Sequence, residues 1–393
     1  MINNLYIDAG SVSLNKHKEE LCGDNVEIVR EKDDMVVAVL ADGLGSGVKA
    51  NILSILTSKI ISTLIANDIN IYTCIKTIAS ILPICSVRKI AYSTFSAVKI
   101  SNNEIAEIIE FDNPQVIVLR NGKYFPLDRT STKIEDKIIY TSKFRLELND
   151  TIIMISDGVV YAGVGFDLNF GWQRDDVIKY IENKYSSTFT AKTIASIVTD
   201  KCNQLYENTP GDDTTCCVLK VLEKKSVNIL IGPPINKEDD EKMARLFFAK
   251  GGKHIVCGGT TAAIASRFLH APIDSSIDLK QLTKDVPPIS HIEGVDLVTE
   301  GVVTINKVLF YINDYLKNNE YYYYWIGSDD GASQITRLLI QDATDINFYV
   351  GKAINPAHQN PDLKIDFSIK MKLIEELTKG LERIGKKTTV SYF

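Results

Sequence analysis

Four short segments of the chain place aspartate in a glycine turn or directly after an apolar run. An isolated Asp-Gly pair is usually a simple turn, because both residues tolerate positive φ. Here Asp42 and Asp157 each follow an uninterrupted apolar run, which would fix the carboxylate at the end of a strand. The segments therefore indicate a shared carboxylate site. Its candidate members are Asp24, Asp42, Asp157, Asp212 and Asp213.

Histidine is absent from this part of the chain, since none occurs between Lys18 and Lys253. Catalysis there would have to run without an imidazole base and without histidine ligands for zinc or iron. Carboxylates favour Mg²⁺ or Mn²⁺, and the carbonyl of Gly43 could add a further oxygen ligand. Two such ions about 3.5–4 Å apart can lower the pKa of a shared water, so that hydrolysis of a phosphate ester needs no protein nucleophile.

The same segments, in the same order, resemble the PPM (protein phosphatase 2C-like) family, and specifically its bacterial stage II sporulation protein E type. The resemblance covers about residues 1–222 and implies an α-β-β-α sandwich with two Mn²⁺ or Mg²⁺ ions at one end. The pieces that carry it are Gly23-Asp24, the block Ala41-Asp42-Gly43 with Gly45 and Gly47, Ser156-Asp157-Gly158, and Gly211-Asp212-Asp213 with Thr215.

The resemblance also implies a role for each aspartate. Asp42 would bridge both ions and the Gly43 carbonyl would bind one of them. Asp157 and Asp212 would hold the other ion. Asp24 would belong to the shell of groups around the metal ions. Asp213 occupies a neighbouring place with a less defined role.

A substrate class follows from the resemblance and not from the residues themselves. It is phosphoserine or phosphothreonine on a regulatory protein, often an anti-sigma-factor antagonist. Two alternatives stay open: a catalytically silent or ligand-gated regulatory scaffold of the same fold, and a metal-dependent phosphohydrolase of a small phosphorylated metabolite or nucleotide.

The chain departs from the family pattern in two places. The turn after Asp42 reads Leu44-Gly45-Ser46, where relatives often carry methionine and histidine. There is also no unambiguous phosphate-binding arginine near the N-terminus. Lys16, His17 and Lys18 could supply a point charge instead, although a solvated charge run is the plainer interpretation.

The elements that would position these residues are strands followed by helices in two blocks, an α+β pattern. The β-branched and aromatic runs predict strands, with Asn121-Gly122 as a hairpin turn. Helices are expected at 46–66, 72–82, 175–184 and 191–208. The expected strands are 5–9, 26–30, 35–41, 92–100, 104–111, 115–119, 137–140, 151–156 and 214–222.

A charged break at residues 223–226 precedes alternating strands and helices, which predict a smaller parallel α/β domain. We therefore expect a phosphatase domain at 1–223 and an α/β domain with a ligand-binding or regulatory role at 224–393. The expected strands are 227–231, 254–257, 295–299 and 346–350 with a short final strand, and the expected helices are 237–250, 260–269, one ending at 316, 332–341 and 368–383.

Two loops of the second domain would lie at the carboxyl edge of its sheet, where such sheets bind ligands. Gly232 follows one expected strand, and Gly258, Gly259, Thr260 and Thr261 join the next strand to a helix. Exposed N–H groups there could bind a small anion. Ordinary turns with a threonine cap explain the same residues, and neither loop matches the Walker A or dinucleotide pattern.

Composition narrows the classes of protein to which the chain could belong. A net charge of −6 indicates no attraction to nucleic acid or anionic membranes. The apolar stretch 52–66 is too short and too polar to span a bilayer, and the N-terminus lacks a signal-peptide pattern. Seven cysteines without a C-x-x-C pair favour reduced thiols and a cytoplasmic location. The aromatic run Tyr321–Trp325 is interpreted as packing, and no oligomeric state is predicted.

Overall fold

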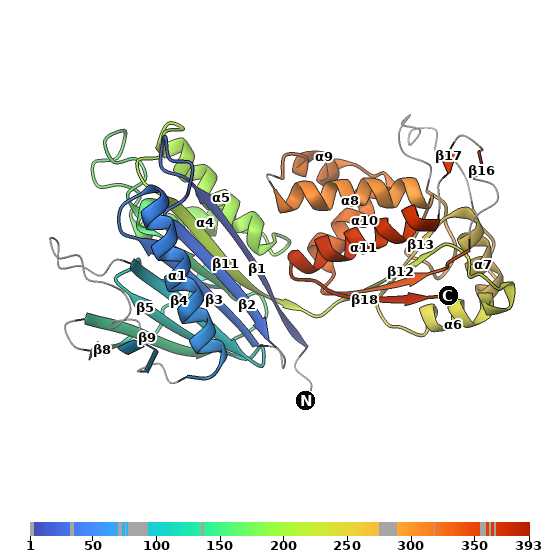
Figure 1. The fold of residues 1–393 in the computed structure, drawn as a ribbon, viewed down its shortest axis with the longest axis horizontal. Coiled ribbons are helices and arrows are strands. Elements are labelled where there is room, and N and C mark those ends of the chain that lie inside the picture. Colours follow the sequence, from blue (N-terminus) through green and yellow to red (C-terminus); the bar gives the residue numbers. More distant parts are fainter. Residues whose placement is uncertain are drawn as a thin grey trace. The chain divides into compact units, whose positions relative to one another are not determined.

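The computed structural model describes residues 4–31, 35–69, 73–74, 76–77, 93–134, 137–274, 289–317, 319–353, 359–360, 363–364 and 367–393. The chain divides into two compact units, Met1–Glu223 and Lys224–Phe393 (Figure 1). The helix expected at 72–82 lies outside the described residues, apart from four of them.

Unit 1 contains two antiparallel sheets. One has the order β1-β11-β10-β6-β7 and the other has the order β2-β3-β4-β5-β9-β8. The strands of the first sheet are β1 (Leu5–Leu14), β6 (Ile117–Arg120), β7 (Lys123–Tyr124), β10 (Thr151–Ile155) and β11 (Thr214–Glu223). Those of the second are β2 (Asp24–Glu31), β3 (Met35–Gly43), β4 (Ser93–Ser101), β5 (Ile105–Phe111), β8 (Thr130–Ile134) and β9 (Lys137–Arg145).

The two sheets pack face to face, with helices on both outer faces. Ile7 and Met154 from the first sheet share one buried cluster with Leu40 and Val98 from the second. α1 (Gly47–Ala66) covers the outer face of the second sheet. α3 (Asp157–Val160), α4 (Arg174–Lys184) and α5 (Ala191–Leu205) cover the outer face of the first sheet (Figure 1). These layers confirm the expected α-β-β-α sandwich.

Helix α1 has an unusual distribution of side chains. Its buried face consists mostly of small or polar residues, such as Ala50 and Ser54, while Ile52 and Leu56 are exposed. Its 20 residues make α1 longer than the apolar stretch expected from the sequence, and it is the one helix of the described residues long and apolar enough to cross a membrane. This is weak evidence for a span, because the core helix of a soluble domain passes the same test.

Unit 2 contains a five-stranded parallel sheet with the order β14-β13-β12-β15-β18. In order of appearance along the chain this is 3-2-1-4-5, a doubly wound arrangement. It confirms the expected parallel α/β class. The strands are β12 (Ser226–Ile231), β13 (Lys253–Cys257), β14 (Leu297–Thr299), β15 (Asp345–Val350) and β18 (Lys387–Tyr392).

Helices pack against both faces of this sheet. One buried cluster joins it to α8 (Val302–Leu316), α10 (Gly331–Arg337) and α11 (Phe367–Arg383). The other joins it to α6 (Asp240–Phe248) and α7 (Gly259–Leu269). The remaining elements are η1 (Lys237–Asp239), α9 (Tyr322–Gly327), η3 (Leu338–Asp342), β16 (Gln359–Asn360) and β17 (Leu363–Lys364).

The packing predicted for the run Tyr321–Trp325 is only partly correct. Trp325 is fully buried, but Tyr321, Tyr323 and Tyr324 are exposed. The run lies at α9, where successive side chains point about 100° apart. A helix can therefore bury only one side of a continuous aromatic run.

Candidate active site

The pairing of two strands brings the first two aspartates together. Asp24 opens β2 and is the register partner of Asp42, which precedes the last residue of β3. The N–H of Gly43 donates to the carbonyl of Gly23 at 3.2 Å, which holds both turns in place. The Ser93 hydroxyl donates to the carbonyl oxygen of Asp42 at 2.8 Å. The Asp42 backbone is therefore fixed from both neighbouring strands.

The other three aspartates come from the opposite sheet. Asp157 follows β10 and is the first residue of α3, whereas Asp212 and Asp213 directly precede β11. The Thr215 N–H donates to the Ser156 hydroxyl at 2.8 Å, and the Ser156 N–H donates to the Thr215 carbonyl at 3.0 Å. These bonds align the end of β10 with the start of β11.

Glycine is required where the segments meet. A Cβ added to Gly43 would lie 2.1 Å from the carbonyl oxygen of Ala50 in α1. A Cβ added to Gly158 would lie 2.1 Å from the carbonyl oxygen of Asp213. The glycine after each strand-end aspartate thus allows a neighbouring backbone to approach closely.

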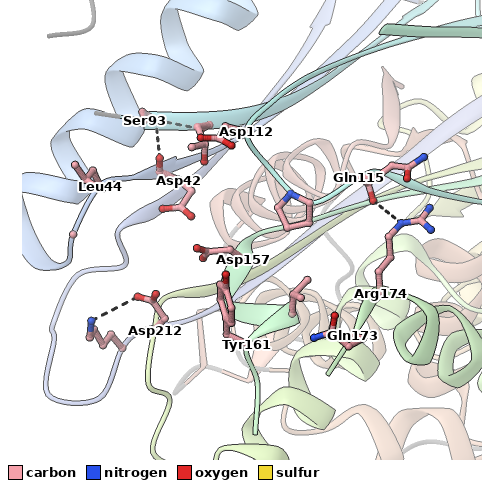
Figure 2. A pocket seen from close by; sticks show the side chains of 15 residues that line it. Asp42, Leu44, Ser93, Asp112, Gln115, Asp157, Tyr161, Gln173, Arg174 and Asp212 are labelled. Carbon is pink, nitrogen blue, oxygen red and sulfur yellow. Dashed lines mark hydrogen bonds and ion pairs between the residues drawn. The ribbon is translucent and has the colours of Figure 1, made fainter. Parts of the chain in front are cut away.

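Asp42, Asp157 and Asp212 line one cavity of about 860 Å³ at the end of the sandwich. Figure 2 shows the carboxylates of Asp42 and Asp157 pointing toward each other, with Asp212 nearby. Asp24 and Asp213 do not line the cavity; both are almost fully buried. The structure therefore brings the five candidate aspartates into one region, three at the cavity wall and two behind it.

Burial and mutual repulsion raise the pKa of these carboxyls. Burial, followed by the charges of Asp24 and Asp157, raises the pKa of Asp42 to about 9. Burial raises the pKa of Asp24 to about 7, although the nearby Ser156 and Thr215 hydroxyls, which do not reach hydrogen-bond geometry with its carboxylate, partly oppose it. The pKa values of Asp157 and Asp212 are also raised, in both cases chiefly by burial. The ionised forms of these carboxyls therefore need nearby positive charge to be stable at neutral pH.

Three buried carboxylate oxygens of the site have no hydrogen-bond partner within the described part of the chain. They are both oxygens of Asp24 and Oδ2 of Asp213. An unpaired buried carboxylate is costly, and a cation is one way to compensate for it. The donors are oxygen atoms only, which suits hard divalent ions such as Mg²⁺ and Mn²⁺.

No three acidic, histidine or cysteine side chains among the described residues converge on one point closely enough to hold an ion by themselves. Mg²⁺ in proteins is usually held by one or two carboxylates together with several waters. The residues present therefore fit divalent ions that each keep part of their hydration shell.

Two basic side chains also line the cavity. The Lys16 ammonium lies 3.7 Å from Oδ1 of Asp212, and its backbone N–H donates to Oδ1 of Asp213 at 3.0 Å. Arg174, at the start of α4, donates from Nε to the Gln115 carbonyl at 3.1 Å, and its guanidinium lies over the ring of Tyr124. Lys16 thus places a positive charge at the acidic wall of the cavity.

Several cavity residues were not predicted from the sequence. They carry no motif and reach the cavity only through the fold, so no local signal could have found them. They include Ser93, Thr94, Asp112, Gln115, Tyr161 and Arg174.

Cys22 adjoins the site but is not suited to act as a nucleophile. Burial, together with the charges of Asp24 and Asp213, raises the pKa of its thiol to about 12. At neutral pH the thiol stays protonated, and a thiol is a poor nucleophile. All the cysteines in the described residues are free, and apart from Cys22 they are buried.

The loops predicted as a ligand site in unit 2 lie at the carboxyl ends of β12 and β13. Gly232 follows β12 with a φ of +75°, and Gly258 follows β13 with a φ of +108°. Gly259, Thr260 and Thr261 form the first turn of α7, where Thr261 is buried and the other two are exposed.

A sandwich of two antiparallel sheets covered by helices, with an acidic cavity at one end, defines the protein phosphatase 2C-like class of fold. Residues 32–222 match the family model described as Stage II sporulation protein E (SpoIIE). This part of the chain is therefore similar to that family. A comparison with curated proteins gave no match.

Several solved structures are similar in fold. One contains the PP2C phosphatase domain and a fragment of the regulatory domain of SpoIIE from Bacillus subtilis, with 18% identity, a TM-score of 0.49, and coverage of 56% of this chain and 64% of that one. The match thus spans less than two thirds of that structure's length.

Two further structures are more distant. The RsbU and RsbW domains of Rv1364c from Mycobacterium tuberculosis show 14% identity and a TM-score of 0.44, with coverage of 62% of this chain and 68% of that one. The catalytic domain of the serine/threonine phosphatase PstP, in complex with two manganese ions, shows 14% identity and a TM-score of 0.37, with coverage of 56% and 100%.

Proposed function

We propose that unit 1 is a metal-dependent protein phosphatase that hydrolyses phosphoserine or phosphothreonine on a regulatory protein. The observation that carries this proposal is the facing pair of Asp42 and Asp157, which come from different sheets and line one cavity with Asp212. Their raised pKa values and the unpaired oxygens of Asp24 and Asp213 support a cation-binding role.

In this proposal Asp42, the Gly43 carbonyl, Asp157 and Asp212 would hold the divalent ions, and Asp24 and Asp213 would support them from the buried side of the cavity wall. Bound divalent ions would supply an activated water and neutralise the phosphoryl oxygens. Lys16 would orient the phosphoryl group through its ammonium.

The reaction would proceed without a covalent enzyme intermediate. The Cys22 thiol stays protonated at neutral pH, and the Ser93 hydroxyl is engaged with the Asp42 carbonyl. No histidine lies between Lys18 and Lys253 to activate either group. Water is therefore the nucleophile that this site favours.

The test is the pair of variants Asp42→Asn and Asp157→Asn in the full chain. Each should abolish Mn²⁺-dependent hydrolysis of a phosphothreonine peptide while circular dichroism shows an unchanged fold. Retained activity in both variants would refute the proposal. ATP and a cyclic nucleotide serve as competing substrates, and faster hydrolysis of either would favour a small-molecule phosphohydrolase instead.

We further propose a small-anion site at the carboxyl edge of the second sheet. The strand order reverses between β12 and β15, which is where doubly wound sheets bind ligands. Near this point the Lys370 ammonium donates to the carbonyls of Gly351 and Ala353, close to Gly232. A thermal-shift screen of the full chain with phosphorylated metabolites tests it, and the absence of any stabilising compound would count against the site.

The physiological partner belongs to the same proposal. Family resemblance implies a phosphorylated anti-sigma-factor antagonist, and the free cysteines favour a reducing, cytoplasmic compartment. Incubating the phosphorylated antagonist with the Mn²⁺-loaded chain and measuring phosphate release tests this assignment.

A further inference from the structure

A loop at the edge of the cavity exposes an unusual set of apolar side chains. We call residues 161–173 the rim loop. It leaves the cavity wall at Tyr161 and returns to it at Gln173, since both of these residues line the cavity. The segment between them therefore lies at the border of the candidate active site.

The rim loop is held in a defined conformation. Trp172 is buried and packs edge-on against Tyr180 of α4, with ring centroids 5.3 Å apart. Leu168 packs against the same buried cluster, and its N–H donates to the Gly163 carbonyl at 3.1 Å. A Cβ at Gly171 would lie 2.3 Å from the Val160 carbonyl oxygen, so the loop closes tightly on its own base.

This anchored loop turns large apolar side chains toward solvent. Phe170 is 81% exposed and Tyr161 is 54% exposed, and Val164 and Phe166 are exposed as well. A cluster of exposed apolar side chains beside a cavity is typical of a binding surface, and aromatic residues are enriched where proteins meet. A loop with no partner would gain nothing from holding these side chains in water.

We propose that the rim loop is the surface that docks the protein substrate, by contacting large apolar side chains next to the phosphorylated residue. The inference rests on the phosphatase function proposed for unit 1. We assign the protein substrate as the binding partner because the exposed apolar side chains are continuous with the candidate active site. Tyr161 belongs both to the cavity wall and to the exposed cluster. A chain whose phosphoryl group sits near Lys16 and Asp157 would pass over this rim.

The rim loop would also determine specificity. A small phosphorylated metabolite can fill the cavity without reaching Phe166 or Phe170, because neither residue lines it. A peptide extends beyond the cavity and can bury its neighbouring side chains against them. The loop would therefore favour phosphoproteins over small phosphate esters.

The experiment compares the full wild-type chain with the double variant Phe166→Ser/Phe170→Ser in the presence of Mn²⁺. Three substrates are used: p-nitrophenyl phosphate, a phosphothreonine peptide with leucine on both sides of the phosphothreonine, and the same peptide with serine in place of both leucines. Wild type should prefer the leucine peptide by about tenfold in kcat/KM, as expected for apolar contacts in a binding site.

The double variant should lose this preference but keep hydrolysis of p-nitrophenyl phosphate within about twofold, since neither phenylalanine touches the cavity. Ile138→Ser is the matched control, because Ile138 is an exposed apolar residue in the edge hairpin β8–β9 of the other sheet. It should behave as wild type does.

Failure of the docking proposal can be distinguished from failure of the phosphatase proposal on which it rests. If wild type hydrolyses none of the three substrates, the phosphatase proposal itself fails and the docking proposal fails with it. If wild type is active but the double variant keeps the same peptide preference, only the docking proposal is overturned. A dimer in wild type that dissociates in the double variant, measured by sedimentation, would assign the rim loop to self-association and equally overturn it.

Discussion

The aspartates of the cavity should make the stability of the metal-free protein depend on pH. Folding raises the pKa of Asp42 from 3.8 to about 9 and that of Asp24 to about 7. A carboxyl whose pKa is raised by folding favours the folded state below its unfolded pKa, and this contribution is lost as the pH rises toward the folded pKa. The site is therefore a source of instability at neutral pH unless cations neutralise it.

We expect the Tm of the protein in EDTA to fall as the pH rises from about 5 to about 9. We also expect Mg²⁺ to raise the Tm more at about pH 8.5 than at about pH 6, because ions and protons compete for the same oxygens. Differential scanning calorimetry checks both. In Asp42→Asn the Tm should depend less on pH, and an equal slope in that variant would contradict the assignment.

Lys16 should matter for substrate binding. Its ammonium is partly exposed and faces Asp212, so it can approach a phosphoryl oxygen without a large rearrangement. Lys16→Ala should raise KM for a phosphothreonine peptide by about tenfold, as expected for loss of one charge-assisted hydrogen bond. Lys18→Ala in the same loop is the control and should leave KM unchanged. An unaltered KM in Lys16→Ala would show that Lys16 does not contribute to substrate binding.

At the level of elements, the close approach between β3 and α1 depends on Gly43. Gly43→Ala would force Cβ against the Ala50 carbonyl and should cost about 1–3 kcal/mol of unfolding free energy. Urea denaturation measures this loss. Gly211→Ala is a matched control beside Asp212, because its Cβ would meet nothing closer than 3.5 Å. Comparable losses in both variants would contradict the steric argument.

Local patterns in the sequence predicted many of the elements. The Asn121-Gly122 hairpin is confirmed by the pairing of Arg120 with Lys123. The helix expected at 46–66 is confirmed as α1. By contrast β8 was missed, because Thr130–Ile134 alternates only weakly between apolar and polar residues.

Two other elements differ from those expected from the sequence. Asp157 follows the strand β10 as expected, but the short helix α3, which begins at Asp157, was not expected. The stretch expected as one helix at 332–341 is α10 followed by the π-helical segment η3. Residue preferences alone are a weak guide to such short segments, because tertiary packing can override them.

The candidate site was predictable at the aspartates and not at the cavity wall around them. Each aspartate sits in a recognisable local motif, so its position could be inferred from its neighbours in sequence. Arg174 and Tyr161 have no such motif and line the cavity only because α3 and α4 follow β10. The exposure of Phe170 likewise depends on the anchoring of Trp172.

At the scale of the whole molecule, each unit has its own buried clusters. Among the described residues, three buried clusters consist of residues before Lys224 and two consist of residues after it. Each unit can therefore be stabilised by its own core. The catalytic proposal concerns unit 1, and the anion-site proposal concerns unit 2.

The most direct test of the account is a crystal of the full chain soaked in MnCl₂ and measured at a wavelength where manganese scatters anomalously. The account predicts two peaks in the cavity beside Asp42, with Asp157 and Asp212 near one of them. A cavity without any anomalous peak, while manganese is bound elsewhere or not at all, would contradict the claim that these carboxylates hold metal ions.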